Sequence, residues 1–502
     1  MCSESFKPET PAEPLPELVP PRVYRSGLHE VLAMAFPIIV AMASSTVMGF
    51  ADYVMVARVG VEQAAAVSPA GILVFVFVSF VGGILSCTNT FVSQSFARHE
   101  FSECSRYVWQ ALYIAVIGGA VSLLLWPVSP WLFRMIGHEA DVRVHEVVYF
   151  QWRLLSIAGM GACHAMTGFF QGISRPKVSM VVALVANALN VFLNWVLIYG
   201  KLGFPAMEVR GAALATAIAA TLQAVVLVGL FLSGGYARRF RSKQVWRMSR
   251  ERMARLLHVG WPAGLSWTLD VLSWGIFMNW FVGRLGKLPL AASNMAGQTL
   301  HLSFMPTVGL GIATTALVGQ NIGRRDFDTA RARASTALKL AMGYMFFMGL
   351  MFFLFRHRIP HIFLKEATTA AESAVNLRIV ELCANVLVLA AIFQAFDAMA
   401  IINNSALKGA GDTRFPALAG VLYAWLIFLP LVWLFTDVMD WGVAGAWGGA
   451  TVYICALGLT LLWRWKRNTW EKIDIFATKP FEPAPYAESP APHEPGEEVS
   501  GG

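Results

Sequence analysis

Long apolar runs separated by short polar segments dominate the pattern of this chain. Each run is long enough to cross a bilayer as a helix, which takes about 20 residues, whereas membrane strands would be about 10 residues of alternating polarity. The runs lie at about 29–57, 65–96, 105–128, 144–170, 177–199, 211–233, 259–283, 290–320, 332–355, 375–405, 414–436 and 444–465. The pattern predicts an all-α polytopic membrane protein with 12 transmembrane helices.

Polar stretches divide the twelve runs into two sets of six. The predicted parts are an N-terminal tail (1–27), an N-lobe (28–235), a basic linker (236–257), a C-lobe (258–466) and a C-terminal tail (467–502). Both tails are expected to be disordered, since the C-terminal one is rich in Pro and acidic residues and short of aliphatics. The linker suits a position against anionic headgroups; a regulatory or RNA-binding role is the alternative.

Lys and Arg concentrate in one alternate set of loops, together with both tails and the linker. By the positive-inside rule these segments are cytoplasmic. The sequence therefore predicts a multi-pass protein of a cell (inner or plasma) membrane with both termini in the cytoplasm.

Composition supports the membrane class and excludes several others. Hydrophobic residues make up 56% of the chain, charged residues 14%, and the mean hydropathy is +0.56. The net charge of +8 is spread over short loops, so no nucleic-acid partner is expected. Six cysteines without a CxxC pair indicate neither zinc nor a disulfide framework. The absence of HExxH or GxSxG argues against an enzyme, and no cofactor is expected.

The two sets of six runs repeat one another. The clearest matches are Pro37 with Pro262, ARVG ending at Gly60 with GRLG ending at Gly286, and VSQSFARHEF from Val92 with VGQNIGRRDF from Val318. Because a six-helix unit is even-numbered, both copies keep one orientation in the membrane. We expect two pseudo-symmetric six-helix bundles with a substrate site between them.

Asp52 is the one carboxylate in the main apolar part of the first run. An acid in hydrocarbon costs roughly 2.5 to 3.5 kcal/mol, so it normally faces a bundle interior or a cavity. The alternative is an acid near the outer interface that reaches headgroup water.

The fifth run carries Asn187, Asn190 and Asn194, spaced three and four residues apart and hence on one helix face. Amides in a membrane often only join helices, by roughly 0.6 to 2 kcal/mol each. We favour that role for Asn187 and leave joining and cation coordination open for the other two.

In the seventh run, Trp267, Asp270, Trp274 and Phe277 form one stripe. An acid between indoles suits an organic cation, through charge and cation–π contacts of roughly 0.5 to 2 kcal/mol. Alternatively, the tryptophans are packing residues or interfacial anchors.

The tenth run contains Asp397, with Phe393 and Gln394 one turn before it. A buried polar seam is the conservative interpretation of this group. No basic residue is expected near the membrane midplane to neutralise the three acids, and Arg153 is placed near the outer end of the fourth helix. A cavity lined by the acids would therefore prefer cations.

The residues resemble the multidrug and toxin extrusion (MATE) family, in its NorM-like branch. The resemblance spans about 28–465 and rests on five strings in order. These are Pro37…Asp52…Gly60, NALNVFLNWVLIYGKLGFPAMEVRGAALATA (Asn187–Ala217), GWPAGLSWTLDVLSWGIF (Gly260–Phe277), FMPTVGLGIATTALVGQNIGRRD (Phe304–Asp326) and FDAMAIINNSALKGAGDTR (Phe396–Arg414).

The resemblance implies that Asp52 couples transport to a cation, with Asn190, Asn194 and Thr216 around it. A hard cation such as Na⁺ needs several oxygen ligands, which these four residues supply. Alternatively Asp52 takes up a proton, since desolvation favours its neutral form. Asn194 stands where another branch of the family often has Asp, so a second N-lobe carboxylate is absent.

In the C-lobe, the resemblance gives Asp270 and Asp397 a role in binding cation or substrate. Asp270 stands where the NorM-like branch usually has Glu, so a C-lobe cation site is weaker or displaced. Trp267, Trp274, Phe277, Phe393 and Gln394 are candidates for lining the substrate site.

The resemblance implies a secondary active antiporter that exports amphipathic, often cationic drugs in exchange for H⁺ or Na⁺, by alternating access between two lobes. Its partners are the lipid bilayer and small organic substrates, and we expect a monomer. The alternative is a flippase of a lipid-linked precursor from the same superfamily, which commonly has fourteen helices and a cationic cavity.

Overall fold

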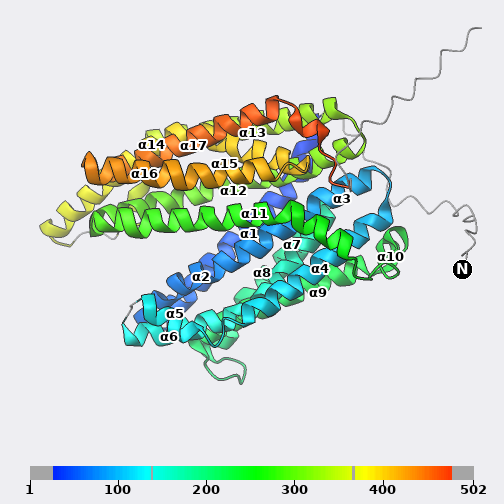
Figure 1. Cartoon of the computed structure of the whole chain (residues 1–502). Coiled ribbons are helices and arrows are strands. Elements are labelled where there is room, and N and C mark those ends of the chain that lie inside the picture. Colours follow the sequence, from blue (N-terminus) through cyan, green and yellow to red (C-terminus); the bar gives the residue numbers. More distant parts are fainter. Residues whose placement is uncertain (1–26, 137–138, 365–367, 477–502) are drawn as a thin grey trace, which may run out of the picture.

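The computed structural model describes residues 27–136, 139–364 and 368–476, and within these ranges the regular structure is entirely helical (Figure 1). The first half comprises α1 (Gly27–Ala57), α2 (Val61–Ser86), α3 (Thr88–Ala97), α4 (Phe101–Leu123), α5 (Ser129–Ile136), α6 (Ala140–Leu154), α7 (Ser156–Gly172), α8 (Pro176–Tyr199), α9 (Glu208–Phe231) and α10 (Gly234–Phe240).

The second half begins with a long helix that continues into a π-helical stretch. Its elements are α11 (Arg250–Ile276), η1 (Phe277–Val282), α12 (Lys287–Gly323), α13 (Phe327–Phe355), η2 (Ile359–Ile362), α14 (Ala370–Gly409), α15 (Arg414–Leu422), η3 (Tyr423–Phe428), α16 (Leu429–Trp433), η4 (Leu434–Val438), α17 (Gly442–Lys466) and η5 (Thr469–Lys472).

All twelve predicted runs are helical, and in the described chain nine helical spans are long and apolar enough to cross a membrane by themselves. The fourth run is divided at Leu155 into α6 and α7, so each piece alone is short. The eleventh run passes through two π-helical stretches, η3 and η4. Such stretches open the backbone by one residue per turn without ending the helix.

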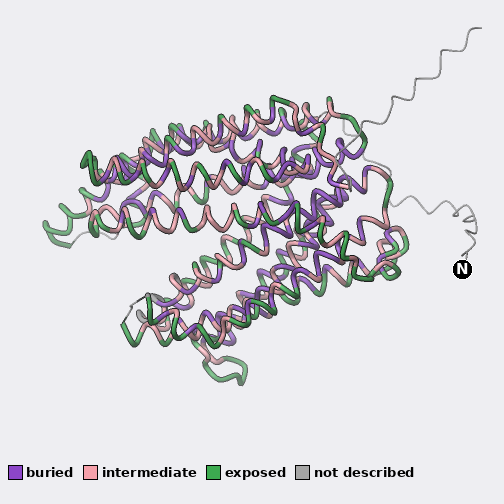
Figure 2. The backbone as a smooth tube through the Cα atoms, viewed as in Figure 1, coloured by how far each residue is buried: buried purple, intermediate pink, exposed green. Residues whose placement is uncertain are grey.

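The helices form two bundles that meet at one end and lie apart at the other (Figure 1). Helices α1–α9 form the N-lobe and α11–α17 the C-lobe; α3 and α10 mark the end where the bundles meet, which we term the closed end. Buried residues gather inside each bundle and at this end (Figure 2). The predicted architecture of two six-helix bundles is confirmed.

Helices α2 and α11 form a tight seam between the lobes. A Cβ atom placed on Gly83 would lie 2.5 Å from the Cα atom of Gly264, so the two backbones touch. One turn farther from the closed end, the hydroxyls of Ser79 and Thr268 are 3.2 Å apart. The two backbones can approach this closely only because Gly83 and Gly264 have no side chains.

Polar contacts join the lobes around the closed end. Gln94 Nε2 donates to the carbonyl of Gly409 over 2.9 Å, and Glu30 pairs with Arg333 over 2.5 Å. Lys408 donates to Ser86 Oγ across the same boundary. Each contact has one partner in each lobe, so all of them must break before the closed end opens.

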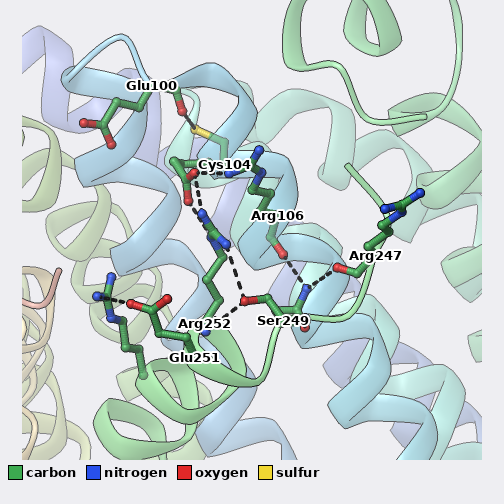
Figure 3. Close-up of polar contacts among 10 residues, drawn as sticks. Glu100, Cys104, Arg106, Arg247, Ser249, Glu251 and Arg252 are labelled. Atoms are coloured by element: carbon green, nitrogen blue, oxygen red, sulfur yellow. Dashed lines mark hydrogen bonds and ion pairs between the residues drawn. The ribbon is translucent and has the colours of Figure 1, made fainter. Parts of the chain in front are cut away.

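The basic linker predicted at 236–257 contains ordered helical structure. Phe240 at the end of α10 is buried against Phe169, and α11 already begins at Arg250. Figure 3 shows Arg252 reaching α4, where Nε and Nη2 donate to Glu103 over 2.8 and 2.9 Å. The segment is therefore fastened to the N-lobe while it leads into the C-lobe.

Ordered structure continues beyond the twelfth span, so the prediction of a disordered tail from residue 467 is wrong for 467–476. Trp470 and Ile475 are buried there. Removing these apolar side chains from water favours the folded form of the segment. Predictions for residues 1–26 and 477–502 lie outside the described residues.

Candidate functional site

Asp52 on α1 faces α8 rather than lipid. The Nδ2 group of Asn194 donates to its Oδ1 atom, and Asn194 itself is fully buried. The seven-residue interval from Asn187 to Asn194 spans two helical turns, which keeps the amides on the face that α1 covers. The sequence-based choice of a bundle-facing acid is therefore correct.

Asn190 lies against the same carboxylate. With its amide nitrogen toward the acid, it donates to Asp52 Oδ1 over 2.8 Å and accepts from the Thr216 backbone N–H over 3.3 Å. With the amide turned the other way, it donates to Thr216 Oγ1 over 3.4 Å and accepts from Asn194 over 3.2 Å. In either orientation the four predicted N-lobe residues form one cluster.

An oxygen in this cluster has no donor. Asn194 Oδ1 is buried without a hydrogen-bond partner in the described chain. A buried carbonyl oxygen that accepts nothing is costly, and a cation beside it would satisfy it. The carboxylate, amide and hydroxyl oxygens match the ligands that a hard cation prefers. The described residues contain no cluster of three His, Cys, Asp or Glu that would hold a transition metal.

A basic residue approaches the N-lobe acid, so the expectation that none does is wrong for Asp52. The Arg153 guanidinium is close enough to act electrostatically on Asp52 and on the Tyr149 hydroxyl. Its Nη1 group lies 3.4 Å from Ser156 Oγ, and its Nε is buried without a hydrogen-bond partner in the described chain. An Arg side chain is long enough to place its guanidinium at a membrane depth different from that of its own Cα atom. The position of Arg153 along its helix therefore did not predict that its charge lies near Asp52.

Asn187 has the structural role that the sequence favoured. Its Nδ2 donates to Ser44 Oγ over 2.9 Å and to Ser45 Oγ over 3.3 Å, which ties α8 to α1. Asn187 lies one turn from Asn190, and its two hydrogen bonds go to these serines rather than to Asp52. The three amides of one face thus divide into one that joins helices and two that surround a carboxylate.

The C-lobe brings together Asp270 from α11, Asp397 from α14 and Tyr453 from α17. The Tyr453 hydroxyl donates to Asp270 Oδ1 over 3.2 Å. The two carboxylates are close enough to act on each other, and Tyr453 feels both. In the described chain, no basic residue acts appreciably on either acid.

The predicted aromatic stripe on α11 splits between two places. The Trp274 ring lies 5.5 Å from that of Phe277 and 5.2 Å from that of Phe428, centroid to centroid. Phe277 is fully buried in this cluster. Trp267 instead contacts Phe75 of the N-lobe at 6.0 Å. In this conformation Trp274 and Phe277 serve as core packing, and Trp267 lies in the seam between the lobes.

Phe393 and Gln394 lie one turn before Asp397. Phe393 is buried in the C-lobe core, and Gln394 donates to Ser303 Oγ over 3.0 Å. This bond joins α14 to α12, as the interpretation of a buried polar seam requires. A role of either residue in lining a substrate site stays a prediction.

Arg153 and Tyr453 are the site residues that the sequence reasoning missed. Each had a weak signal: a guanidinium inside an apolar run and a single phenol in the last span. Helix periodicity shows which residues share a face, but it does not show which faces of distant helices meet.

The sequence profile of the family described as MatE matches residues 37–196 and 266–434. The chain belongs to the MatE family. The matched ranges cover most of the chain and include Asp52, Arg153, Asp270 and Asp397. Membership of this family, together with curated relatives named for multidrug resistance, identifies the chain as a transporter and not an enzyme.

Relatives of this MatE chain include proteins named for drug resistance. It is 28% identical over 455 residues to the probable multidrug resistance protein NorM of Mesorhizobium japonicum, which covers 89% of the chain and 96% of the relative. It is 27% identical over 456 residues to the multidrug resistance protein NorM of Burkholderia vietnamiensis, with 90% and 96% covered. The expected NorM-like assignment is confirmed.

Solved structures share the fold. The crystal structure of the eukaryotic MATE transporter AtDTX14 superposes with a TM-score of 0.78 at 20% identity, covering 89% of this chain and 98% of the other. An outward-facing multidrug resistance MATE family transporter of the MOP superfamily superposes with a TM-score of 0.77 at 18% identity, covering 89% and 97%.

Proposed function

We propose that this chain is a secondary active antiporter, which exports amphipathic, often cationic compounds in exchange for H⁺ or Na⁺. The two bundles alternate access to a shared path between them. The observation that carries the proposal is the pair of acidic sites, one inside each lobe of a two-lobed MatE transporter. Multidrug resistance proteins among the relatives support the substrate class.

The coupling ion acts at Asp52. Its carboxylate accepts from Asn194, and the unpartnered Asn194 oxygen lies in the same cluster. A proton would neutralise the acid, whereas Na⁺ would bind the carboxylate together with the amide and hydroxyl oxygens. Inward movement of one positive charge releases about 2.3 kcal/mol for each 100 mV of membrane potential.

The closed end faces the cytoplasm of a cell (inner or plasma) membrane, and the path opens toward the outside. The basic segment 236–257 includes most of α10, which lies at this end (Figure 1), and Arg98 directly follows α3 there. Positive residues of membrane proteins concentrate on the cytoplasmic side. The conformation described above is then the outward-open state.

Efflux from vesicles tests this proposal. Purified protein is reconstituted in liposomes loaded with a cationic dye, and a pH gradient or a Na⁺ gradient is imposed separately. We expect dye movement under at least one gradient and none from protein-free liposomes. Dye movement at the same rate with and without each gradient would exclude antiport.

A lipid-linked-precursor flippase is the alternative within the superfamily. Such a protein needs basic groups for a diphosphate, whereas the C-lobe site holds two carboxylates and a phenol. The same liposomes with a fluorescent polyprenyl diphosphate test it, and we expect no flipping above the protein-free rate.

A further inference from the structure

Residues 469–476, which we term the strap, follow the last transmembrane helix and begin on the C-lobe. Trp470 is fully buried, and its ring stacks on that of Trp465 with 4.4 Å between centroids and 5° between planes. Its Nε1 donates to the Trp465 carbonyl over 3.0 Å, and Glu471 pairs with Arg331. The first half of the strap is therefore fixed to α17 and α13.

The second half of the strap crosses to the N-lobe. Phe476 lies edge-on to Phe91 at 5.8 Å and to Tyr107 at 5.9 Å between centroids. Ile475 is 7% exposed and belongs to the N-lobe hydrophobic cluster, while on its other side it touches Gly411 of the C-lobe. Ile475 thus fills the space between the two lobes.

Arg98 of the N-lobe holds the end of the strap by two contacts. Its guanidinium carbon lies 4.4 Å from the centroid of the Phe476 ring, and its Nη2 is 3.6 Å from the Asp474 carboxylate. That carboxylate also accepts the Phe476 backbone N–H over 2.9 Å, which fixes the turn. Apolar, cation–π and ionic contacts therefore converge on three consecutive residues, Asp474, Ile475 and Phe476.

The strap ends at a junction of both lobes. Phe476 lines a pocket of about 460 Å³ together with Arg98 and Tyr107 of the N-lobe and Arg252 and Arg255 of α11. Figure 3 shows the neighbouring polar contacts, with Arg252 and Glu251 on α11 beside α4. Because α11 is fastened to the N-lobe at Arg252 and continues into the C-lobe, movement of the lobes at this end changes the surroundings of Phe476.

We propose that the strap is a built-in latch, which docks on the N-lobe through Ile475 and Phe476 and favours the state with the closed end shut. The latch rests on the proposed alternating access. It differs from the other contacts across this end, because its docking residues lie outside every transmembrane helix. Release of the strap therefore requires no helix to unwind, and its strength sets the frequency of opening.

A buried reporter cysteine measures that frequency. Ser93 is buried against Gly319 of the other lobe, so a Ser93→Cys chain without other cysteines reacts with a membrane-impermeant maleimide only when the closed end opens. The reaction rate is compared between the parent, a chain that ends at Lys472, and the double variant Ile475→Ala/Phe476→Ala.

We expect about tenfold faster labelling in both strap variants, which corresponds to about 1.4 kcal/mol. Two controls should label at the parent rate: a chain that ends at Thr478, which keeps the strap, and Phe204→Ala, which removes an exposed phenylalanine far from the closed end. A second set of chains keeps Ser93 and has Cys383, which is buried in the C-lobe core, as its single cysteine. Cys383 should stay unlabelled in every strap variant, which would exclude unfolding as the cause of faster labelling.

The outcomes separate the latch from the transport cycle. Parent and strap variants that label at equal rates, while dye efflux persists, would overturn the latch alone. A reporter that stays unlabelled in all chains, even with dye and both cations present, would overturn the latch and alternating access together.

Discussion

The acidic sites of the two lobes differ in how their charge is balanced. In the N-lobe, one carboxylate, Asp52, lies among amides and within reach of the Arg153 guanidinium. In the C-lobe, Asp270 and Asp397 act on each other, and Tyr453 supplies a single hydrogen bond. The first site carries roughly no net charge when its acid is ionised, whereas the second carries up to two negative charges.

In the proposed transport cycle, this difference favours separate roles for the two sites. A site near neutrality binds a small cation through geometry and can release it when the lobes move. A site with two carboxylates attracts positive charge by its field and tolerates varied shapes. The internal repeat has therefore produced two copies of one scaffold with unequal electrostatics.

Loss of the N-lobe acid should have the largest effect. Asp52→Asn keeps the shape of the side chain but removes the charge that binds the coupling ion, so gradient-driven dye efflux from liposomes should fall to the protein-free rate. Asn187→Ala is the matched control, because it removes an amide on the same face that only joins helices. Efflux that persists in Asp52→Asn would show that the N-lobe site does not couple.

Dye binding in the C-lobe should withstand the loss of either Asp270 or Asp397, but not the loss of both. Asp270→Asn and Asp397→Asn each leave one carboxylate, so affinity for a cationic dye should fall by a few fold. The double variant should lose about ten- to a hundredfold, since each charge contributes about 0.7 to 1.4 kcal/mol at short range in a partly solvated site. Equilibrium dye binding in detergent measures this, with a neutral dye as the control. A double variant that binds the dye no more weakly than either single variant would contradict a shared site.

Removal of the N-lobe guanidinium should strengthen cation binding. Arg153→Gln takes away a positive charge that competes with the ion at Asp52, so the dissociation constant of the ion should fall about tenfold, or about 1.4 kcal/mol. Arg153→Lys keeps the charge and serves as control. Weaker binding in Arg153→Gln would mean that Arg153 positions Asp52 rather than competes for it.

The smallest effect is expected at the phenol of the C-lobe. Tyr453→Phe removes one hydrogen bond to Asp270 and keeps the ring that stacks on Phe428. At the lower end of its usual range a net hydrogen bond is worth about 0.5 kcal/mol, so dye affinity should change by only about twofold. Thermal unfolding of the variant should match that of the parent, and a large loss of stability would assign Tyr453 to the core instead.

The sequence predicted each helix and each acid, but not all the neighbours of those acids. Apolar run length determines a transmembrane helix, and the three-and-four spacing placed Asn190 and Asn194 on one face. The sequence did not predict Arg153 and Tyr453 as neighbours of the acids, because their proximity to Asp52 and Asp270 depends on how separate helices pack. Trp267 shows the same limit, since its stripe crosses from the C-lobe core to the seam between the lobes.

The backbone crossing at Gly83 and Gly264 has a mechanical consequence. It lies only a few residues from the closed-end terminus of α2, whereas Val61 at the far terminus is about 33 Å away at 1.5 Å per residue. A rotation of about 10° about this point moves the far terminus by about 6 Å, while the crossing itself hardly shifts. Two residues without side chains thus give the pair of helices a short arm and a long one, so that a small shift at the closed end corresponds to a wide movement at the opposite end of the bundles.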